Sequence, residues 1–126
     1  MKRVIKQTNI YGMSRVGYSN GYEVYVNTDD PGNIPHFHYR DKDDWSKFHS
    51  CIRIDKADYF QHEGKEDTLN AHQRKDLQEF MESPVDDIKY GKSFKNNWEL
   101  VCFLWNINNS TKRIDDNIKM PNYRLL

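Results

Sequence analysis

Hydrophobic and polar positions alternate along residues 13–27, a pattern typical of two β-strands. Asn20-Gly21 separates the two runs and is a preferred pair for a two-residue hairpin turn, because both positions of a type I′ turn need positive φ. We therefore expect a hairpin of strands 13–19 and 22–27. Period two divides the second strand into an apolar face of Tyr22, Val24 and Val26 and a polar face of Glu23, Tyr25 and Asn27.

Two further alternating runs predict strands at residues 34–40 and 48–55, and a shorter run predicts a fifth strand at 58–62. The charged segment 41–47 joins the first two of these, and so short a connection favours an antiparallel pair. On the strand 34–40, three polar residues share one face: His36, His38 and Arg40. On the strand 48–55, the polar face holds His49, Cys51, Arg53 and Asp55.

The pattern then changes to a helical period. One stripe of a helix over 69–82 collects Leu69, Gln73, Leu77, Phe80 and Met81. The start can be capped by Asp67, Thr68 or Asn70, and Ser83-Pro84 ends the helix, because the residue before a proline avoids the α region.

Residues 98–107 are apolar nearly all round, and ten residues suit either a buried helix or a buried strand. We favour the helix, because Asn96 or Asn97 can cap its start and Asn108-Asn109 can end it. Its tryptophans are expected in the core. The tail 110–126 should pack in part, and Pro121 prevents a helix that runs to its end.

These elements predict a single α+β domain over 1–126. Its mainly antiparallel sheet has four to five strands, with the helices 69–82 and 98–107 packed on one face. An aromatic content of 13% supplies bulky core material, and 19 basic residues balance 19 acidic ones, so no global charge attracts nucleic acid or an anionic membrane. The balanced charge leaves open a local basic patch that binds nucleic acid.

Targeting signals and cysteine usage indicate a cytoplasmic protein. No run of 18 apolar residues predicts a transmembrane helix, and the basic N-terminus is not followed by the apolar stretch of a secretory signal. Cys51 and Cys102 do not make a disulfide framework. We expect two reduced, mostly buried thiols, and nothing in the sequence activates Cys51 as a nucleophile.

The concentrated chemical signal is Pro35-His36-Phe37-His38-Tyr39-Arg40. Two histidines at i and i+2 on a strand point to the same side, with β carbons about 6–7 Å apart. At that spacing two imidazoles can bind one metal or share one phosphate. If the strands 34–40 and 48–55 pair, further binding residues join this face: His49, Arg53, Asp55 and, from the hairpin, Tyr25.

Four interpretations of this face stay open. One is partner binding. Another is a solvated or structural face without chemistry, because an antiparallel sheet usually has one solvated polar face. A divalent metal such as zinc would use His36 and His38, with a third ligand from His49, His62, Asp29 or Asp30. Catalysis on a phosphodiester would use His36 and His38 as the acid and base, with Arg40 or Arg53 holding the negative charge.

The order of a hairpin, an acidic turn, Pro35-His36-Phe37-His38, a strand, a helix and Asn97-Trp98 resembles a small bacterial domain-of-unknown-function group. Its members carry a Pro-Pro-His-x-His core and often occur in toxin–antitoxin-like gene pairs. Asn33-Ile34-Pro35 replaces the double proline here, and Asp29-Asp30 replaces an acidic-His pair. The resemblance implies an α+β fold and a cytosolic, toxin–antitoxin-like or mobile-element setting.

We therefore expect a small cytoplasmic toxin–antitoxin-like or mobile-element protein with a small protein partner. Its His36 and His38 face would bind a phosphate-bearing ligand or a metal, and the sequence leaves open whether it is an enzyme. The alternative is a non-enzymatic interaction module, for example a phage or defence-related binding protein, that uses a sheet edge or an aromatic surface.

Overall fold

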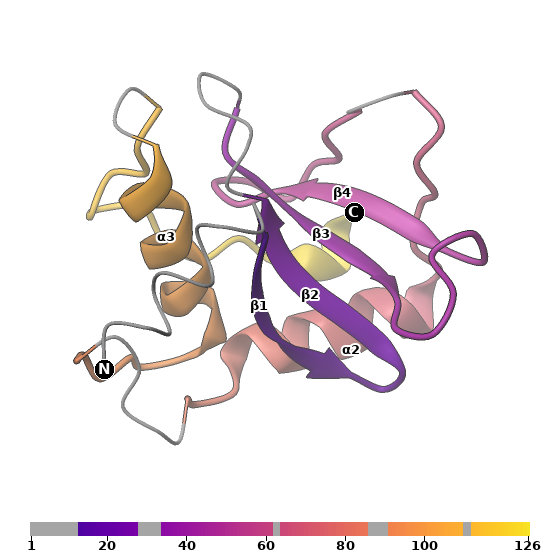
Figure 1. Cartoon of the computed structure of the whole chain (residues 1–126), viewed down its shortest axis with the longest axis horizontal. Helices are drawn as coiled ribbons and strands as arrows, with labels where there is room; N and C mark the ends of the chain where they lie inside the picture. The colour runs from indigo at the N-terminus through magenta and orange to yellow at the C-terminus, as the bar shows by residue number, and fades with distance from the viewer. Residues whose placement is uncertain (1–12, 28–33, 62–63, 86–90, 110–111) are drawn as a thin grey trace.

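The computed structural model describes residues 13–27, 34–61, 64–85, 91–109 and 112–126. Four strands form one antiparallel sheet in the order β1-β2-β3-β4 (Figure 1): β1 (Met13–Ser19), β2 (Tyr22–Asn27), β3 (His36–Asp41) and β4 (His49–Arg53). The helices α2 (Ala71–Glu82) and α3 (Asn97–Asn108) follow, and the 3₁₀ helix η1 (Tyr123–Leu125) lies near the C-terminus. The predicted α+β fold is confirmed. Three candidate ligands lie outside the described residues: Asp29, Asp30 and His62.

The hairpin of β1 and β2 turns where the sequence predicted. Asn20 has φ 47° and Gly21 has φ 89°, the two positive values that a type I′ turn requires. Ser19 pairs with Tyr22 directly across this turn. The register of β1 shifts between Arg15 and Gly17, so a β-bulge interrupts the pairing beyond the turn.

β3 lies between β2 and β4, and its register determines which polar side chains meet. Tyr25 on β2 and Cys51 on β4 are both paired with His38. The expected antiparallel neighbours 34–40 and 48–55 are confirmed, with slightly different ends. The segment expected as a fifth strand makes a single bridge, between Ile52 and Tyr59, in the part that the structure describes.

Both helices begin and end at the residues that their caps specify. Asn70 accepts a hydrogen bond from the Gln73 backbone N–H, and the Gln73 side chain accepts one from the Asn70 backbone N–H, which together form a capping box. α2 ends before Ser83. Residues 97–108 form a helix and not a buried strand, with Asn96 accepting from the backbone N–H of Glu99.

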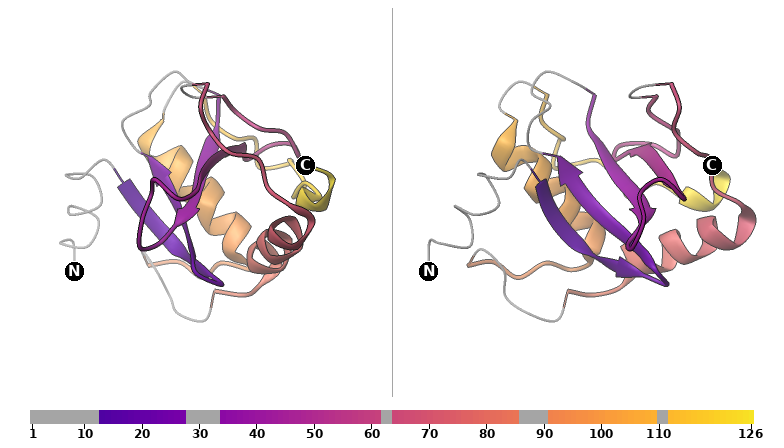
Figure 2. Two further views of the ribbon diagram at one scale, coloured as in Figure 1. Left: turned by 90° about the vertical axis from the view of Figure 1, so that its right-hand side faces the viewer. Right: turned by 45° about the vertical axis from the view of Figure 1, so that its right-hand side comes forward.

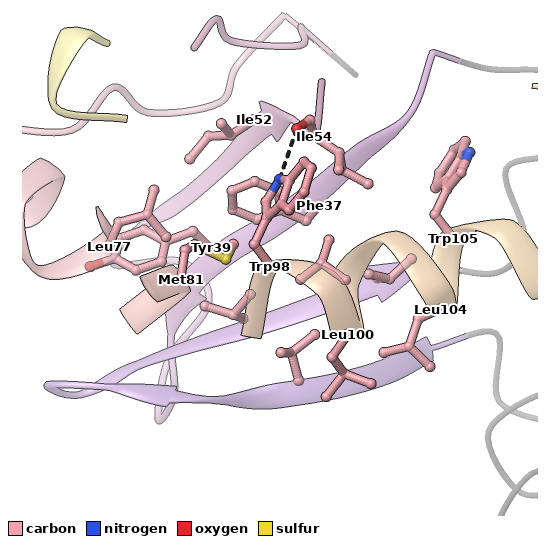
Figure 3. Packing of buried hydrophobic residues seen from close by; sticks show 14 of the residues in the cluster. Phe37, Tyr39, Ile52, Ile54, Leu77, Met81, Trp98, Leu100, Leu104 and Trp105 are labelled. Carbon is pink, nitrogen blue, oxygen red and sulfur yellow. Dashed lines mark hydrogen bonds between the residues drawn. The ribbon is translucent and has the colours of Figure 1, made fainter. Parts of the chain in front are cut away.

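α2 and α3 lie on the same side of the sheet (Figure 2). They bury the apolar face of the strands, in which Val24, Phe37 and Ile52 are inaccessible to solvent. Trp98 packs in this core and donates its indole N–H to the Ile54 carbonyl at 3.0 Å (Figure 3). The C-terminal Tyr123 is also fully buried, so the tail packs as expected. None of the described helices has the length and apolarity needed to cross a membrane.

Candidate metal centre

The polar face of the sheet is buried, and the expectation of a solvated face is wrong for its central residues. Six of them are at most 5% exposed: Glu23, Tyr25, His36, His38, Arg40 and Cys51. Aromatic rings from outside the sheet contribute to this burial, because Phe60 stacks on His36 and Trp45 lies over Arg40. Polar groups removed from water in this way need partners within the protein.

Arg40 finds such partners on the neighbouring strand. Its Nε and Nη2 donate to Oε1 of Glu23 at 2.9 and 2.8 Å, and its Nη1 donates to the Tyr25 hydroxyl at 3.2 Å. Arg15 donates to the second carboxylate oxygen of Glu23. Arg40, the residue proposed to hold a phosphate, is thus 2% exposed and its guanidinium forms an ion pair with Glu23.

The two arginines also determine the charge state of Glu23. Burial by itself raises the pKa of the Glu23 carboxyl, but the hydrogen bonds and charges of Arg15 and Arg40 outweigh burial. The net result is a pKa below its ordinary value of 4.5. Glu23 is thus ionised at neutral pH and balances the charge of Arg40.

His36 and His38 project to the same side of the sheet, as period two predicts, and their ring centroids are 5.2 Å apart. Nδ1 of His36 lies 2.8 Å from the backbone oxygen of Ile34, so this nitrogen carries a proton and donates it. The His36 ring also stacks on Phe60, with centroids 4.3 Å apart. These contacts direct Nδ1 of His36 to the backbone and not to a shared ligand.

His38 instead meets His49 and Cys51, and these three residues form a group that could hold a metal ion. One potential ligand atom from each lies within 4.8 Å of the other two. Nδ1 of His38 is 2.8 Å from Nε2 of His49 and 3.3 Å from Sγ of Cys51. The sheet produces this arrangement, because Cys51 is paired with His38 across the strands and His49 lies two residues before Cys51 on the same face.

The contacts of His38 argue against a proton relay of the kind found in cysteine hydrolases. A relay histidine uses one ring nitrogen for the nucleophile and the other for the group that orients the ring. Here His49 and Cys51 approach the same nitrogen of His38. Three potential ligand atoms that converge in this way could hold a metal ion.

Tyr25, predicted as a binding residue, lies against the centre without joining the three ligands. Its ring stacks on His38 with centroids 4.5 Å apart and planes 12° apart. Burial raises the pKa of its phenol to about 12, so that Tyr25 is neutral at physiological pH. It is a neighbour of the centre and does not compete as an anionic ligand.

Arg53 and Asp55 pair with one another at the end of β4. The guanidinium Nε and Nη2 donate to the two carboxylate oxygens, each at 2.9 Å. Both side chains are partly exposed, 21% for Arg53 and 23% for Asp55. The predicted binding role of this pair stays a prediction, since neither residue belongs to the metal group.

The sequence named His36 and His38 as metal ligands, with His49 as one of four candidates for the third, and did not name Cys51. Among the described residues, the group that could hold a metal instead joins Cys51 to His38 and His49 and leaves His36 out. The signal was present: His49 and Cys51 have the spacing i and i+2 on one face of a strand, as His36 and His38 do. What the sequence could not supply was the register that places Cys51, and not His36, beside the donor atoms of His38 and His49.

Comparison with known proteins returns no match, whether the chain is compared with family models, with curated proteins or with solved structures. The resemblance to the Pro-Pro-His-x-His group therefore stays a prediction.

Proposed function

We propose that this protein binds a divalent transition metal, with zinc as the best fit, through His38, His49 and Cys51. The observation that carries the proposal is the convergence of Nδ1, Nε2 and Sγ within 4.8 Å of one another. Two imidazoles and a thiolate are the nitrogen and sulfur donors that zinc prefers. Magnesium and calcium prefer oxygen ligands, so the donor set disfavours them.

The distances suit tetrahedral coordination after a small adjustment. Zinc bonds of about 2.0–2.3 Å to nitrogen and sulfur set the ligand atoms roughly 3.3–3.6 Å apart in a tetrahedron. The separation of 3.3 Å between Cys51 Sγ and His38 Nδ1 is about 0.2–0.3 Å shorter than the nitrogen–sulfur separation in such a tetrahedron. The nitrogens of His38 and His49, 2.8 Å apart, would have to separate by about half an ångström, which small side-chain rotations provide.

Burial supports a thiolate ligand at this position. Cys51 is 1% exposed and His38 is 4% exposed, so water competes weakly for the metal. A buried thiolate without a counter-charge would be costly, and a bound cation removes that cost as it displaces the thiol proton. Three protein ligands leave a fourth position for water or for an oxygen of a ligand, as in catalytic zinc sites.

The wider functional setting belongs to the same proposal. A phosphate oxygen could occupy the fourth position, which would unite the two expected ligands, a metal and a phosphate-bearing molecule. The toxin–antitoxin-like or mobile-element context, the small protein partner and the cytoplasmic location rest on the sequence. An interaction module is the alternative that absence of metal binding would favour.

Metal analysis of the purified protein tests the proposal. We expect about one zinc per chain after dialysis against zinc, and loss of that zinc in His38→Gln and Cys51→Ser. Cobalt in place of zinc should show thiolate-to-cobalt charge-transfer absorption that disappears in Cys51→Ser. The controls are Cys102→Ser, the second cysteine, and His72→Gln, whose side chain is 79% exposed. Unaltered zinc content in Cys51→Ser, or none in the unmodified protein, would refute the site.

A further inference from the structure

A continuous run of planar groups lies beside the three candidate ligands on the polar face. The guanidinium carbon of Arg40 is 3.1 Å from the ring centroid of Trp45 and 4.1 Å from that of Tyr25. The Tyr25 ring in turn stacks on His38 at 4.5 Å. The run therefore extends from Trp45, which is 54% exposed, to a ligand that is 4% exposed.

We infer that Tyr25 and Arg40 are positioning residues that hold the His38 ring in the plane required for metal binding. The inference rests on the proposed metal site. It assigns a role to two residues that are not among the three candidate ligands.

The direction of the nitrogen lone pair limits where a metal can bind His38. An imidazole nitrogen donates its electron pair in the plane of the ring, so a metal bound to Nδ1 must lie in the plane of His38. The ring of Tyr25 is 12° from parallel to that plane, and tilting the imidazole would break the stack. The orientation of Tyr25 thus restrains the plane of the His38 ring, in which a metal bound to Nδ1 must lie.

Arg40 restrains Tyr25 in turn. Its Nη1 donates to the Tyr25 hydroxyl at 3.2 Å, and its own position is determined by the ion pair with Glu23. The register of the sheet places these four residues together, because Tyr25 is paired with His38 and Glu23 is paired with Arg40. Glu23 also offsets the charge of Arg40, which would otherwise repel a cation.

Two variants separate stacking from hydrogen bonding. Tyr25→Phe keeps the stack and loses the bond to Arg40, so zinc affinity should fall less than about 10-fold. Tyr25→Leu loses both, and affinity should fall about 10–100-fold, the usual effect of removing an outer-shell partner. The cobalt absorption spectrum should change shape in Tyr25→Leu, which general destabilisation would not cause. Tyr25→Met, whose unbranched side chain adapts to irregular gaps, replaces Tyr25→Leu if the latter does not fold.

Tyr18→Leu is the matched control, because Tyr18 is a tyrosine of the same hairpin that is 52% exposed and lies over Arg15 and not over His38. Its zinc affinity and cobalt spectrum should equal those of the unmodified protein. Unchanged affinity and spectrum in Tyr25→Leu, with zinc still bound, would overturn the inference and leave the metal site standing.

A measurement without metal distinguishes the two proposals. Long-range ¹H–¹⁵N correlations report the tautomer and ring exchange of His38 in the metal-free protein. We expect one sharp set of signals in the unmodified protein and in Tyr25→Phe, and averaged or broadened signals in Tyr25→Leu. If these changes occur but neither the unmodified protein nor any variant binds zinc, the proposed metal site is refuted. The restraint of Tyr25 on the His38 ring is then still supported. Identical His38 signals in all three proteins would overturn the inference.

Discussion

Phe37 and His38 are neighbours on β3 and are 0% and 4% exposed, yet they project to opposite faces of the sheet. Phe37 lies among aliphatic and aromatic side chains beneath the helices (Figure 3). His38 lies among a tyrosine, two histidines and a cysteine. Both faces are buried, but the apolar face gains its stability from area removed from water, and the polar face must also satisfy each of its polar groups.

This difference affects how each face responds to substitution. On the apolar face, the stability lost on substitution scales with the side-chain volume removed. The loss comes from apolar contacts and from the cavity that remains. On the polar face the loss depends on which group is left behind, since a buried charge without its partner costs more than the pair contributes. Substitutions on the two faces should therefore differ in the stability that they cost.

Phe37→Ala should destabilise the protein by about 3–5 kcal/mol, the usual loss for a buried aromatic residue. Chemical denaturation monitored by tryptophan fluorescence measures the change. Ile107→Ala, at a position that is 43% exposed, serves as the control and should change the free energy of unfolding little. Similar values for the two variants would contradict the assignment of Phe37 to the core.

Glu23→Gln should cost roughly 3 kcal/mol, the lower end for breaking a buried ion pair, because Tyr25 and Trp45 still contact Arg40. The double variant Glu23→Gln/Arg40→Met should recover part of this loss, since no buried charge remains. Denaturation of the two single variants and the double variant gives the coupling energy. Additive losses would show that Glu23 and Arg40 are energetically independent.

Zinc should stabilise the unmodified protein by about 2.7 kcal/mol at a concentration 100 times its Kd, because it binds the folded state. The increase in melting temperature should vanish in Cys51→Ser and persist in Cys102→Ser. The effect belongs to the polar face alone, so Phe37→Ala, if folded, should keep the same zinc-dependent increase. Equal stabilisation of the unmodified protein and Cys51→Ser would exclude Cys51 as a ligand.

Acidification should lower the free energy of unfolding, because it protonates Glu23 on the polar face. The pKa of this carboxyl is lowered in the folded protein, so its contribution is fully present above its ordinary value of 4.5 and is lost as pH falls through the lowered pKa. Urea denaturation at pH 7 and pH 3 should show a smaller decrease for Glu23→Gln than for the unmodified protein. The same decrease in both would assign the acid sensitivity to other groups.

The smallest expected effects distinguish two buried tyrosines. Tyr25→Phe should cost about 1–2 kcal/mol, because the hydroxyl accepts a hydrogen bond from the charged Arg40. Tyr39→Phe, on the apolar face, should leave stability unchanged or raise it by up to about 1 kcal/mol. The Tyr39 hydroxyl is buried and has no hydrogen-bond partner among the residues that the structure describes. Thermal unfolding of both variants checks the difference.

Much of the fold follows from residues that are close in the sequence. The Asn20-Gly21 turn, the Asn70 and Asn96 caps and the end of α2 at Ser83-Pro84 all lie where local patterns place them. Period two also assigned side chains to the correct faces of the sheet, including His36 and His38. The interpretation of the polar face as solvated is wrong for its central residues, because alternation tells which side a residue faces and not what covers that side.

The sequence by itself determined the elements and the two-sided pattern of the strands, because turns, caps and alternation depend on a few adjacent residues. Only the tertiary structure decided the membership of the candidate metal centre. His38 and Cys51 are 13 residues apart, and they meet because β3 and β4 pair in one particular register. Burial of the polar face was decided in the same way, since Trp45 and Phe60 reach it from segments whose positions no local pattern specifies.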